Sequence, residues 1–250
     1  MNIIITGATS GIGKATVEKF LTDNPKAKLW LIARRAERLR QIKDRWPDRD
    51  IRFSTLDVRD RQAVQSWSEQ LQREWPRVDL LVNNAGLALG IAAFHDGDMD
   101  DWDTMIDTNV KGLLYMTKAV LPLMIPHRAG HVINIGSTAG KVAYENGNVY
   151  CATKYAVDAI GQTLRIDMLP HGIKVTNVNP GMVETEFSLV RLKGDREKAQ
   201  SVYNGFEVLR PEDVADVILY CALLPSHVCV NDITVTCTQQ ANSYYKYANP

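Results

Sequence analysis

The N-terminal region carries the pattern that most constrains the fold of this chain. A β-branched run at residues 3–5 leads into Gly7-Ala8-Thr9-Ser10-Gly11-Ile12-Gly13, and an apolar helical pattern follows it. A strand, a glycine turn and a helix in that order are typical of dinucleotide-binding folds. The glycines let the backbone approach a pyrophosphate, and the helix N-terminus supplies N–H donors. The glycine spacing is G-x-x-x-G-x-G, and a tight turn that binds nothing remains an alternative interpretation.

The rest of the chain alternates between short apolar runs and amphipathic helical patterns. Such alternation favours a parallel sheet covered on both faces. We therefore predict an α/β fold, a single Rossmann-type doubly wound parallel sheet of about seven strands, in one domain spanning residues 1–250. The predicted strands are residues 3–6, 29–33, 52–56, 80–83, 132–135, 174–179 and 233–235.

Two aspartates precede helical patterns and are predicted to cap them. Asp60 stands before the apolar positions of the third helix, and Asp100 stands before those of the fourth. An aspartate at this position accepts hydrogen bonds from the unpaired N–H groups of the first turn. Asp60 therefore needs no catalytic role.

The charge balance argues against a nucleic-acid or membrane partner. Lys+Arg and Asp+Glu both number 29, so there is no global basic field. No stretch approaches the roughly 18 uninterrupted apolar residues of a membrane span, and the chain opens directly into a strand. We expect a cytoplasmic protein that acts on a small molecule.

Cysteine and histidine positions do not indicate a metal site. The four cysteines lack Cys-x-x-Cys spacing, and reduced thiols are expected. Cys151 is adjacent to Tyr150, so oxidation there could affect activity, but a small buried core residue is the simpler interpretation.

Two arginines stand at the end of the second predicted strand. About twenty residues past the glycine turn, an NAD-selective site places an acidic residue on the ribose 2′-hydroxyl. This chain has Arg34 and Arg35 there instead. Arginine can pair with a 2′-phosphate bidentately, so the pattern favours NADP, with Arg34 the stronger candidate. The alternative is that both, with Arg38, form a solvated helix start.

The pattern Tyr150-x-x-x-Lys154, thirteen residues after Ser137, indicates proton-transfer chemistry. On a helix, the i, i+4 spacing places the phenol and the ammonium on one face. A nearby cation favours phenolate, so we expect Lys154 to lower the Tyr150 pKa from ~10 toward neutrality. Ser137 could then orient the substrate oxygen. Taken alone, this spacing also describes one buried ring and one solvated amine.

Taken together, these motifs resemble those of the short-chain dehydrogenase/reductase family. Four occur in that family's order: Thr6-Gly7-x-x-x-Gly11-Ile12-Gly13, Asn83-Asn84-Ala85-Gly86, Ser137 and Tyr150-x-x-x-Lys154. The resemblance implies a catalytic tetrad of Asn109, Ser137, Tyr150 and Lys154. It also implies that Asp57-Val58 contacts adenine and that the 180–185 region holds the nicotinamide. The predicted cofactor-binding residues are Gly7, Thr9, Ser10, Gly11, Ile12, Gly13, Arg34, Arg35, Asp57, Val58, Asn84, Ala85, Gly86, Tyr150, Lys154, Pro180, Gly181, Val183 and Thr185.

The resemblance extends to one branch of that family, the NADP-dependent 3-hydroxy acid dehydrogenases, also described as serine or allo-threonine dehydrogenases. Residues 81–90, 105–113, 133–140, 147–150 and 185–191 carry it. This branch implies hydride transfer between NADP(H) and a small 3-hydroxy acid or hydroxy amino acid, in a homotetramer.

The charged residues 184–206 interrupt the alternating pattern and are predicted to form a lid over the substrate. If the substrate carries a carboxylate, Arg191 or Lys193 could bind it, and we favour Arg191. A mobile lid without substrate contact would have the same composition.

The resemblance implies a division of labour in which Tyr150 exchanges the proton, Ser137 hydrogen-bonds the same oxygen, Lys154 holds the nicotinamide ribose, and Asn109 connects Lys154 through water to solvent. Three alternatives stay open: a carbonyl reductase of uncharged ketones or aldehydes, a silent NADP-binding sensor or scaffold, and an oligomeric partner that buries its 244–247 tail.

Overall fold

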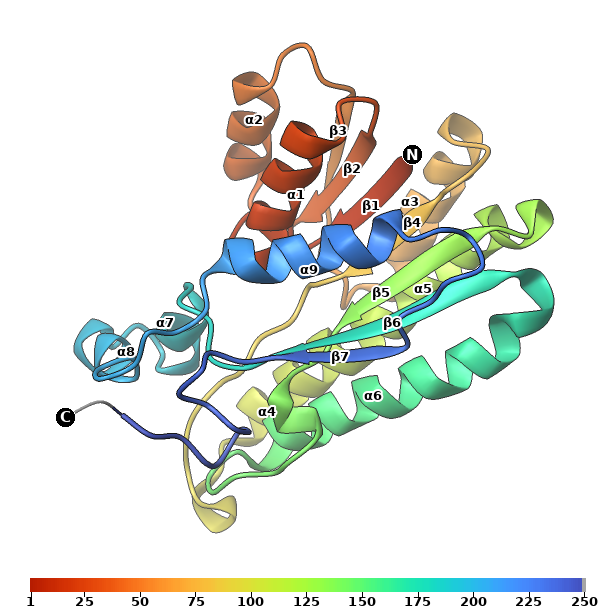
Figure 1. Ribbon diagram of the computed structural model, residues 1–250. Helices are drawn as coiled ribbons and strands as arrows, with labels where there is room; N and C mark the ends of the chain where they lie inside the picture. Colours follow the sequence, from red (N-terminus) through yellow and green to blue (C-terminus); the bar gives the residue numbers. More distant parts are fainter. Residues whose placement is uncertain (249–250) are drawn as a thin grey trace.

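Seven parallel strands form one sheet in the order β3-β2-β1-β4-β5-β6-β7 (Figure 1). The computed structural model describes residues 1–248. The strands are β1 (Asn2–Thr6), β2 (Lys28–Ala33), β3 (Ile51–Thr55), β4 (Leu80–Asn83), β5 (Gly130–Ile135), β6 (Ile173–Pro180) and β7 (Asp232–Val235). The predicted fold class is confirmed, and each predicted strand agrees with the observed one to within two residues at either end. The strand order reverses between β1 and β4, and such a reversal opens a crevice at the carboxyl ends of the strands.

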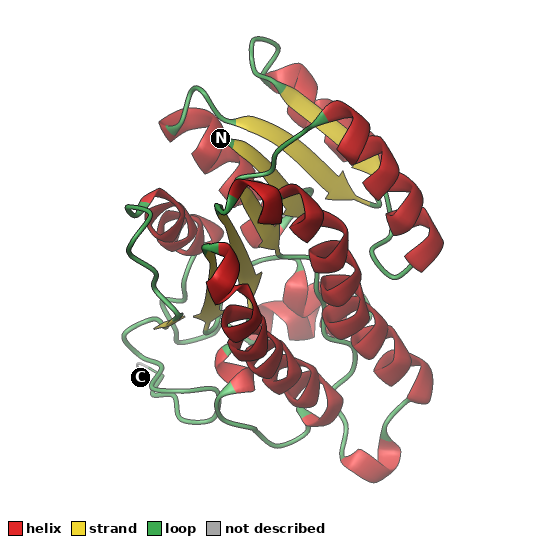
Figure 2. Ribbon diagram, turned by 90° about the vertical axis from the view of Figure 1, so that its right-hand side faces the viewer, coloured by secondary structure: helices red, strands yellow, loops and turns green. Residues whose placement is uncertain are grey.

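Helices cover both faces of this sheet (Figure 2). They are α1 (Gly11–Asp23), α2 (Ala36–Arg45), α3 (Arg61–Glu74), α4 (Met99–Ile106), α5 (Leu113–Val120), α6 (Asn148–Met168), α7 (Phe187–Arg191), α8 (Arg196–Ser201) and α9 (Pro211–Leu223). A π-helical segment η2 (Asp107–Gly112) joins α4 to α5, and short 3₁₀ turns occupy η1 (Phe94–Asp96), η3 (Leu121–Leu123), η4 (Ile125–His127), η5 (Thr138–Gly140) and η6 (Leu169–His171). No helix in residues 1–248 is long and apolar enough to cross a membrane.

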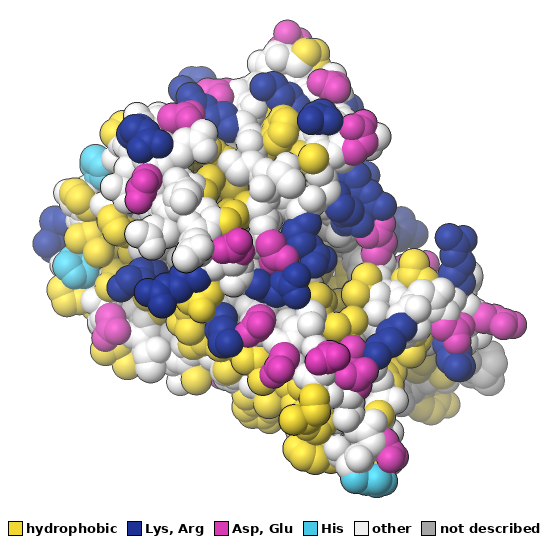
Figure 3. Space-filling model, turned by 180° about the vertical axis from the view of Figure 1, so that it is seen from behind, with side chains coloured by type: hydrophobic (Ala, Val, Ile, Leu, Met, Phe, Trp, Pro, Cys, Tyr) yellow, Lys and Arg dark blue, Asp and Glu magenta, His cyan; other side chains and the backbone are white. Residues whose placement is uncertain are grey.

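Two separate apolar cores hold the helices against the sheet. Ile3 and Ile5 of β1 pack with α1, α2 and α9, whereas Ile4 points to the other face and packs with α3 and α5. This division follows from the two-residue period of a strand, which sends alternate side chains to opposite faces. The polar outer surface carries both signs of charge, which are interspersed over the face in Figure 3.

One of the two predicted helix caps is confirmed and the other is wrong. Asp60 caps α3, where its side chain accepts a hydrogen bond from the Ala63 amide at 3.0 Å. Asp98, not Asp100, caps α4, with its carboxylate accepting from the Asp100 amide at 3.0 Å. Asp98 has the extended backbone that directs a carboxylate back onto the first turn, while Asp100 already lies inside the helix.

His131 in β5 is a buried histidine with one unused ring nitrogen. Its Nε2 lies 2.7 Å from the Thr176 hydroxyl, and that hydroxyl donates to the Val230 carbonyl at 2.6 Å. Thr176 must therefore accept from His131, so Nε2 carries the hydrogen. Within residues 1–248 Nδ1 has no partner. Burial, with a smaller effect of the Lys174 charge, lowers the pKa of His131 from 6.5 to about 3.

This histidine predicts acid-sensitive folding. Because its pKa is lower in the folded chain, the unfolded chain binds an extra proton, and stability falls as the pH drops below 6.5. Between pH 7 and 5 the loss from this one group should be about 2 kcal/mol. His131→Gln keeps a donor toward Thr176 and should show a smaller loss in urea unfolding at the two pH values. Equal losses in the two proteins would contradict the assignment.

Candidate active site

A long cleft follows the carboxyl ends of the strands and passes between the sheet and residues 183–190. Its lining includes every predicted cofactor-binding residue except Gly13. Ser137 also lines it, whereas Asn109 and Arg191 do not. Sequence reasoning missed several lining residues, which follow the recognised motifs or come from elements without a motif: Ile32, Ala33, Leu56, Leu87, Thr108, Ile135, Gly136, Glu186, Phe187 and Val190.

The glycine turn at one side of this cleft has the shape of an anion site. Gly7 has a left-handed backbone with φ of 65°, and α1 begins at Gly11. The N-cap residue Ser10 makes no side-chain capping hydrogen bond within residues 1–248, so the first amides of α1 are left for an incoming group. Gly13 contributes differently, because a β-carbon there would collide with the Gly7 carbonyl and the Asn84 amide. These features fit a bound pyrophosphate.

The arginines after β2 have different surroundings. Arg34 is exposed, lines the cleft, and makes no hydrogen bond or ion pair in the described part of the chain. Arg35 pairs with Glu186 at 2.8 Å, and its Nε donates to the Thr9 hydroxyl at 3.2 Å. Arg38 pairs with the other oxygen of Glu186 at 2.7 Å. Among the described residues, Arg34 is therefore the cleft arginine whose guanidinium makes no hydrogen bond or ion pair.

Ser137, Tyr150 and Lys154 meet at the opposite end of the cleft. Ser137 follows β5, and the other two lie in the first turns of α6, where both are buried. The Lys154 ammonium donates to the Ile135 carbonyl at 2.9 Å and lies 5.9 Å from the centroid of the Tyr150 ring. The structure thus brings together the three residues that the sequence spacing singled out.

The protonation states differ from the prediction. Burial, with a smaller effect of Tyr144, raises the pKa of Tyr150 above its ordinary value, although the neighbouring Ser137 hydroxyl and the positive charge of Arg191 oppose this. Burial also lowers the pKa of Lys154 to about 8. The expected lowering of the Tyr150 pKa by Lys154 is therefore wrong for the protein without ligand. Desolvation disfavours the charged form of each group, and it is the largest cause of both shifts.

Asn109 lies behind the cleft, in the π-helical segment η2. Its amide nitrogen donates to the Leu87 carbonyl at 2.8 Å and to the Thr153 hydroxyl at 3.0 Å. Its oxygen accepts from the Leu87 amide at 2.9 Å. Asn109 therefore ties the loop after β4 to α6 beside Lys154. π-Helical turns of this kind often occur at functional sites.

Arg191 approaches Tyr150 from the 184–206 segment. Its guanidinium carbon lies 5.6 Å from the Tyr150 ring centroid and 5.4 Å from that of Tyr144. Nη1 donates to the Tyr144 hydroxyl at 2.8 Å and Nε to the Gly90 carbonyl at 3.3 Å. These bonds use two of the five N–H donors of the guanidinium. No sequence motif indicated Tyr144, because its contact with Arg191 depends on how the two segments pack in the folded chain.

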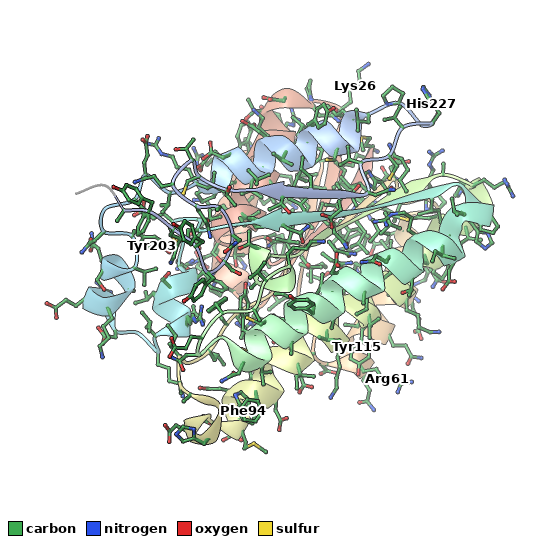
Figure 4. The ribbon with its side chains drawn as sticks, turned by 60° about the horizontal axis from the view of Figure 1, so that its bottom comes forward. Lys26, Arg61, Phe94, Tyr115, Tyr203 and His227 are labelled. Atoms are coloured by element: carbon green, nitrogen blue, oxygen red, sulfur yellow. The ribbon has the colours of Figure 1, made fainter. Side chains whose placement is uncertain are left out.

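The other predicted carboxylate ligand faces away from this site. Lys193 pairs with Asp101 at 2.8 Å and with Asp98 at 3.2 Å. It thereby fixes the 184–206 segment to α4. Further along the segment the Tyr203 hydroxyl lies 2.6 Å from that of Ser188, and Figure 4 shows Tyr203 beside α7 and α8.

Neither metal ligands nor cysteines add to the site. In residues 1–248 no three His, Cys, Asp or Glu side chains gather in a way that could hold a metal ion. Cys151 is buried with Tyr150 and Ala139 in a small apolar cluster. This packing agrees with a core role for Cys151.

The strand order, the glycine turn and the cluster of Ser137, Tyr150 and Lys154 together define a dinucleotide-dependent oxidoreductase. The chain belongs to the short-chain dehydrogenase family, whose model, described as short chain dehydrogenase, matches residues 1–194.

Three known proteins are similar over nearly the whole chain. The NADP-dependent 3-hydroxy acid dehydrogenase of Escherichia coli K12 is 45% identical over 234 residues, which cover 93% of each chain. Sulfoacetaldehyde reductase 2 of Chromohalobacter salexigens is 45% identical over 245 residues, covering 97% of this chain and 96% of its own. The closed form of a serine dehydrogenase complexed with NADP+ superimposes with a TM-score of 0.93 at 42% identity, covering 100% of both chains.

Proposed function

We propose that this protein is an NADP-dependent oxidoreductase that transfers hydride between NADP(H) and a small 3-hydroxy acid or hydroxy amino acid. The observation that carries the substrate class is the position of Arg191. Its partly unused guanidinium lies beside the buried tyrosine that would exchange the proton. An arginine in that position can pair with a substrate carboxylate while the hydroxyl carbon faces the nicotinamide.

The substrates named for two of the similar proteins share one feature that Arg191 could recognise. A 3-hydroxy acid and sulfoacetaldehyde both carry an acid group one carbon away from the reacting carbon. A carboxylate and a sulfonate are both compact anions that accept several hydrogen bonds from one guanidinium. This common chemistry supports an anionic substrate over an uncharged ketone.

The residues of the cleft fit NADP along its length. The first turn of α1 would hold the pyrophosphate, Arg34 the 2′-phosphate, and Thr185 with the 180–183 loop the nicotinamide end. The bound cofactor supplies or accepts the hydride. Lys154, with its ammonium anchored on the Ile135 carbonyl, would hold the nicotinamide ribose.

Tyr150 is proposed as the proton donor and acceptor. Because burial raises its pKa, the phenol is protonated at neutral pH and ready to donate to a carbonyl oxygen in the reducing direction. Ser137 would hydrogen-bond that same oxygen. Asn109 would position the water molecules that connect Lys154 to solvent.

Within the single domain that we predict for residues 1–250, the 184–206 segment is proposed as a lid. Its attachment to α4 through Lys193 and to Gly90 through Arg191 supports this role. A homotetramer and a cytoplasmic location stay predictions. Exposed Tyr244, Tyr245 and Tyr247 in the tail support a further subunit contact.

The proposed reaction predicts a specific pattern of turnover. With NADP, serine, allo-threonine, 3-hydroxypropionate and 3-hydroxybutyrate should reduce the cofactor, as followed by nicotinamide absorbance. Tyr150→Phe should lower kcat by about a thousandfold or more, because general acid–base catalysis contributes factors of that size. Tyr155→Phe, on the same helix but hydrogen-bonded to the Lys141 carbonyl, should remain active. NADP binding without turnover of any substrate would favour the sensor alternative.

Removal of Arg191 should separate charged from uncharged substrates. With the hydroxy acid 3-hydroxypropionate as substrate, Arg191→Leu should raise KM about tenfold to a hundredfold, since a charged hydrogen bond contributes on that scale. The turnover of a carboxylate-free alcohol should change far less. Arg196→Met removes an exposed cation of the same segment that forms no ion pair in residues 1–248, and it serves as the control. Equal losses with both kinds of substrate would refute carboxylate recognition by Arg191.

Arg34 should determine the choice between the two nicotinamide cofactors. Arg34→Ala should weaken NADPH binding about tenfold, because one charged contact to the 2′-phosphate is lost. NADH binding should stay nearly constant in fluorescence titrations. The matched control is Arg40→Ala, which removes an exposed arginine of α2 that does not line the cleft. If both cofactors weakened equally, the 2′-phosphate would bind elsewhere.

A further inference from the structure

Glu186 connects the 184–206 segment, on one side of the cofactor cleft, to the arginines after β2 on the other side. It is the N-cap residue of α7, near the start of the 184–206 segment, and it lines the cleft. One carboxylate oxygen lies 2.8 Å from Arg35 Nη1 and the other lies 2.7 Å from Arg38 Nη1. The three residues Glu186, Arg35 and Arg38 are called the clasp below.

The clasp is anchored on the glycine turn. Arg35 Nε donates to the Thr9 hydroxyl at 3.2 Å, and Arg38 Nη1 donates to the Thr9 carbonyl at 3.4 Å. The two sides of the cleft also meet beside it, because a β-carbon on Gly11 would lie 3.1 Å from the Thr185 methyl group. The 184–206 segment is thereby attached to the same turn that would hold the pyrophosphate.

The charges of the clasp leave the 2′-phosphate site to another residue. Glu186 partly neutralises Arg35 and Arg38, whereas Arg34 lines the cleft without a protein partner in residues 1–248. The attachment and the proposed recognition of the 2′-phosphate therefore use different guanidinium groups. Closure by the clasp does not require the 2′-phosphate to be present.

We propose that Glu186 is a positioning residue for the cofactor, which holds the 184–206 segment closed over the bound dinucleotide and slows its release. The inference rests on the proposed NADP-dependent function. It extends that function, because it assigns cofactor retention to a carboxylate in the segment that is proposed as the substrate lid. Since the clasp joins two parts of the protein, it should retain NADPH and NADH by the same factor.

A different role for Glu186 would change NADPH binding in the opposite direction. If its carboxylate competed with the 2′-phosphate for Arg35, its removal would tighten NADPH binding and leave NADH binding unchanged. Measuring both cofactors therefore decides between retention and competition.

The first experiment compares Glu186→Gln with the wild type in the absence of substrate. Dissociation constants for NADPH and NADH come from fluorescence titration, and the NADPH release rate comes from stopped-flow displacement. Loss of two partly exposed ion pairs should raise the dissociation constants of both cofactors about fivefold. The NADPH release rate should rise by a similar factor. Glu197→Gln is the control, because Glu197 is an exposed acid of the same segment that forms no ion pair in residues 1–248.

A double-mutant cycle tests whether the effect passes through the clasp. Arg38 does not line the cleft, so Arg38→Gln should reproduce the weaker binding without removing a cofactor contact. Glu186→Gln combined with Arg38→Gln should weaken binding by less than the product of the two single effects, since they break a shared ion pair. In steady-state assays at saturating oxo acid the KM for NADPH should rise while kcat does not fall, a split that general destabilisation would not produce.

The outcomes separate this inference from the proposed function. If Glu186→Gln binds both cofactors as the wild type does, or binds NADPH more tightly, the retention role is overturned while the proposed function stands. If the wild type binds neither NADPH nor NADH, the proposed function itself is overturned and the inference fails with it.

Discussion

The site depends above all on the parallel pairing of β1 with β2 on one side and with β4 on the other. This pairing reverses the direction in which the chain adds strands and leaves a crevice at their carboxyl ends. The glycine turn after β1, the arginines after β2 and the loop after β4 all end at that crevice. Residues from widely separated parts of the sequence are thus brought to a single cleft by strand order, before any side-chain contact is made.

Desolvation sets the chemistry within this cleft. Tyr150 and Lys154 are buried together, and burial favours the neutral form of each, so the phenol holds its proton while the pKa of the ammonium falls to about 8. Ser137 and Arg191 act in the opposite direction on Tyr150. A substrate carboxylate bound to Arg191, as proposed, would partly neutralise the positive charge that lowers the Tyr150 pKa. Substrate binding and the proton affinity of Tyr150 are therefore expected to be linked through Arg191.

The 184–206 segment contacts the protein at three places along the crevice. Glu186 pairs with cations near the glycine turn, Arg191 reaches Tyr144 and Gly90, and Lys193 pairs with acids at the start of α4. The sequence indicated Arg191 and Lys193 as candidate carboxylate ligands, but it did not indicate Glu186 or any of these protein partners. In the structure the three charges point to different partners. The segment can therefore connect cofactor binding at one end of the cleft with substrate binding at the other.

The sequence by itself determined the seven strands, the glycine turn and the spacing of Tyr150 and Lys154, because these depend on local periodicity and on residue types at fixed separations. It placed one helix cap wrongly, because three aspartates near α4 satisfy the same local pattern and only the backbone at Asp98 selects among them. Only the tertiary structure showed that the Tyr144 hydroxyl accepts a hydrogen bond from Arg191. It also showed that Lys193 pairs with acids of the α4 region and that Glu186 pairs with Arg35 and Arg38. These contacts join residues up to 151 positions apart. They arise from packing between elements, and neither periodicity nor motif spacing records which elements meet.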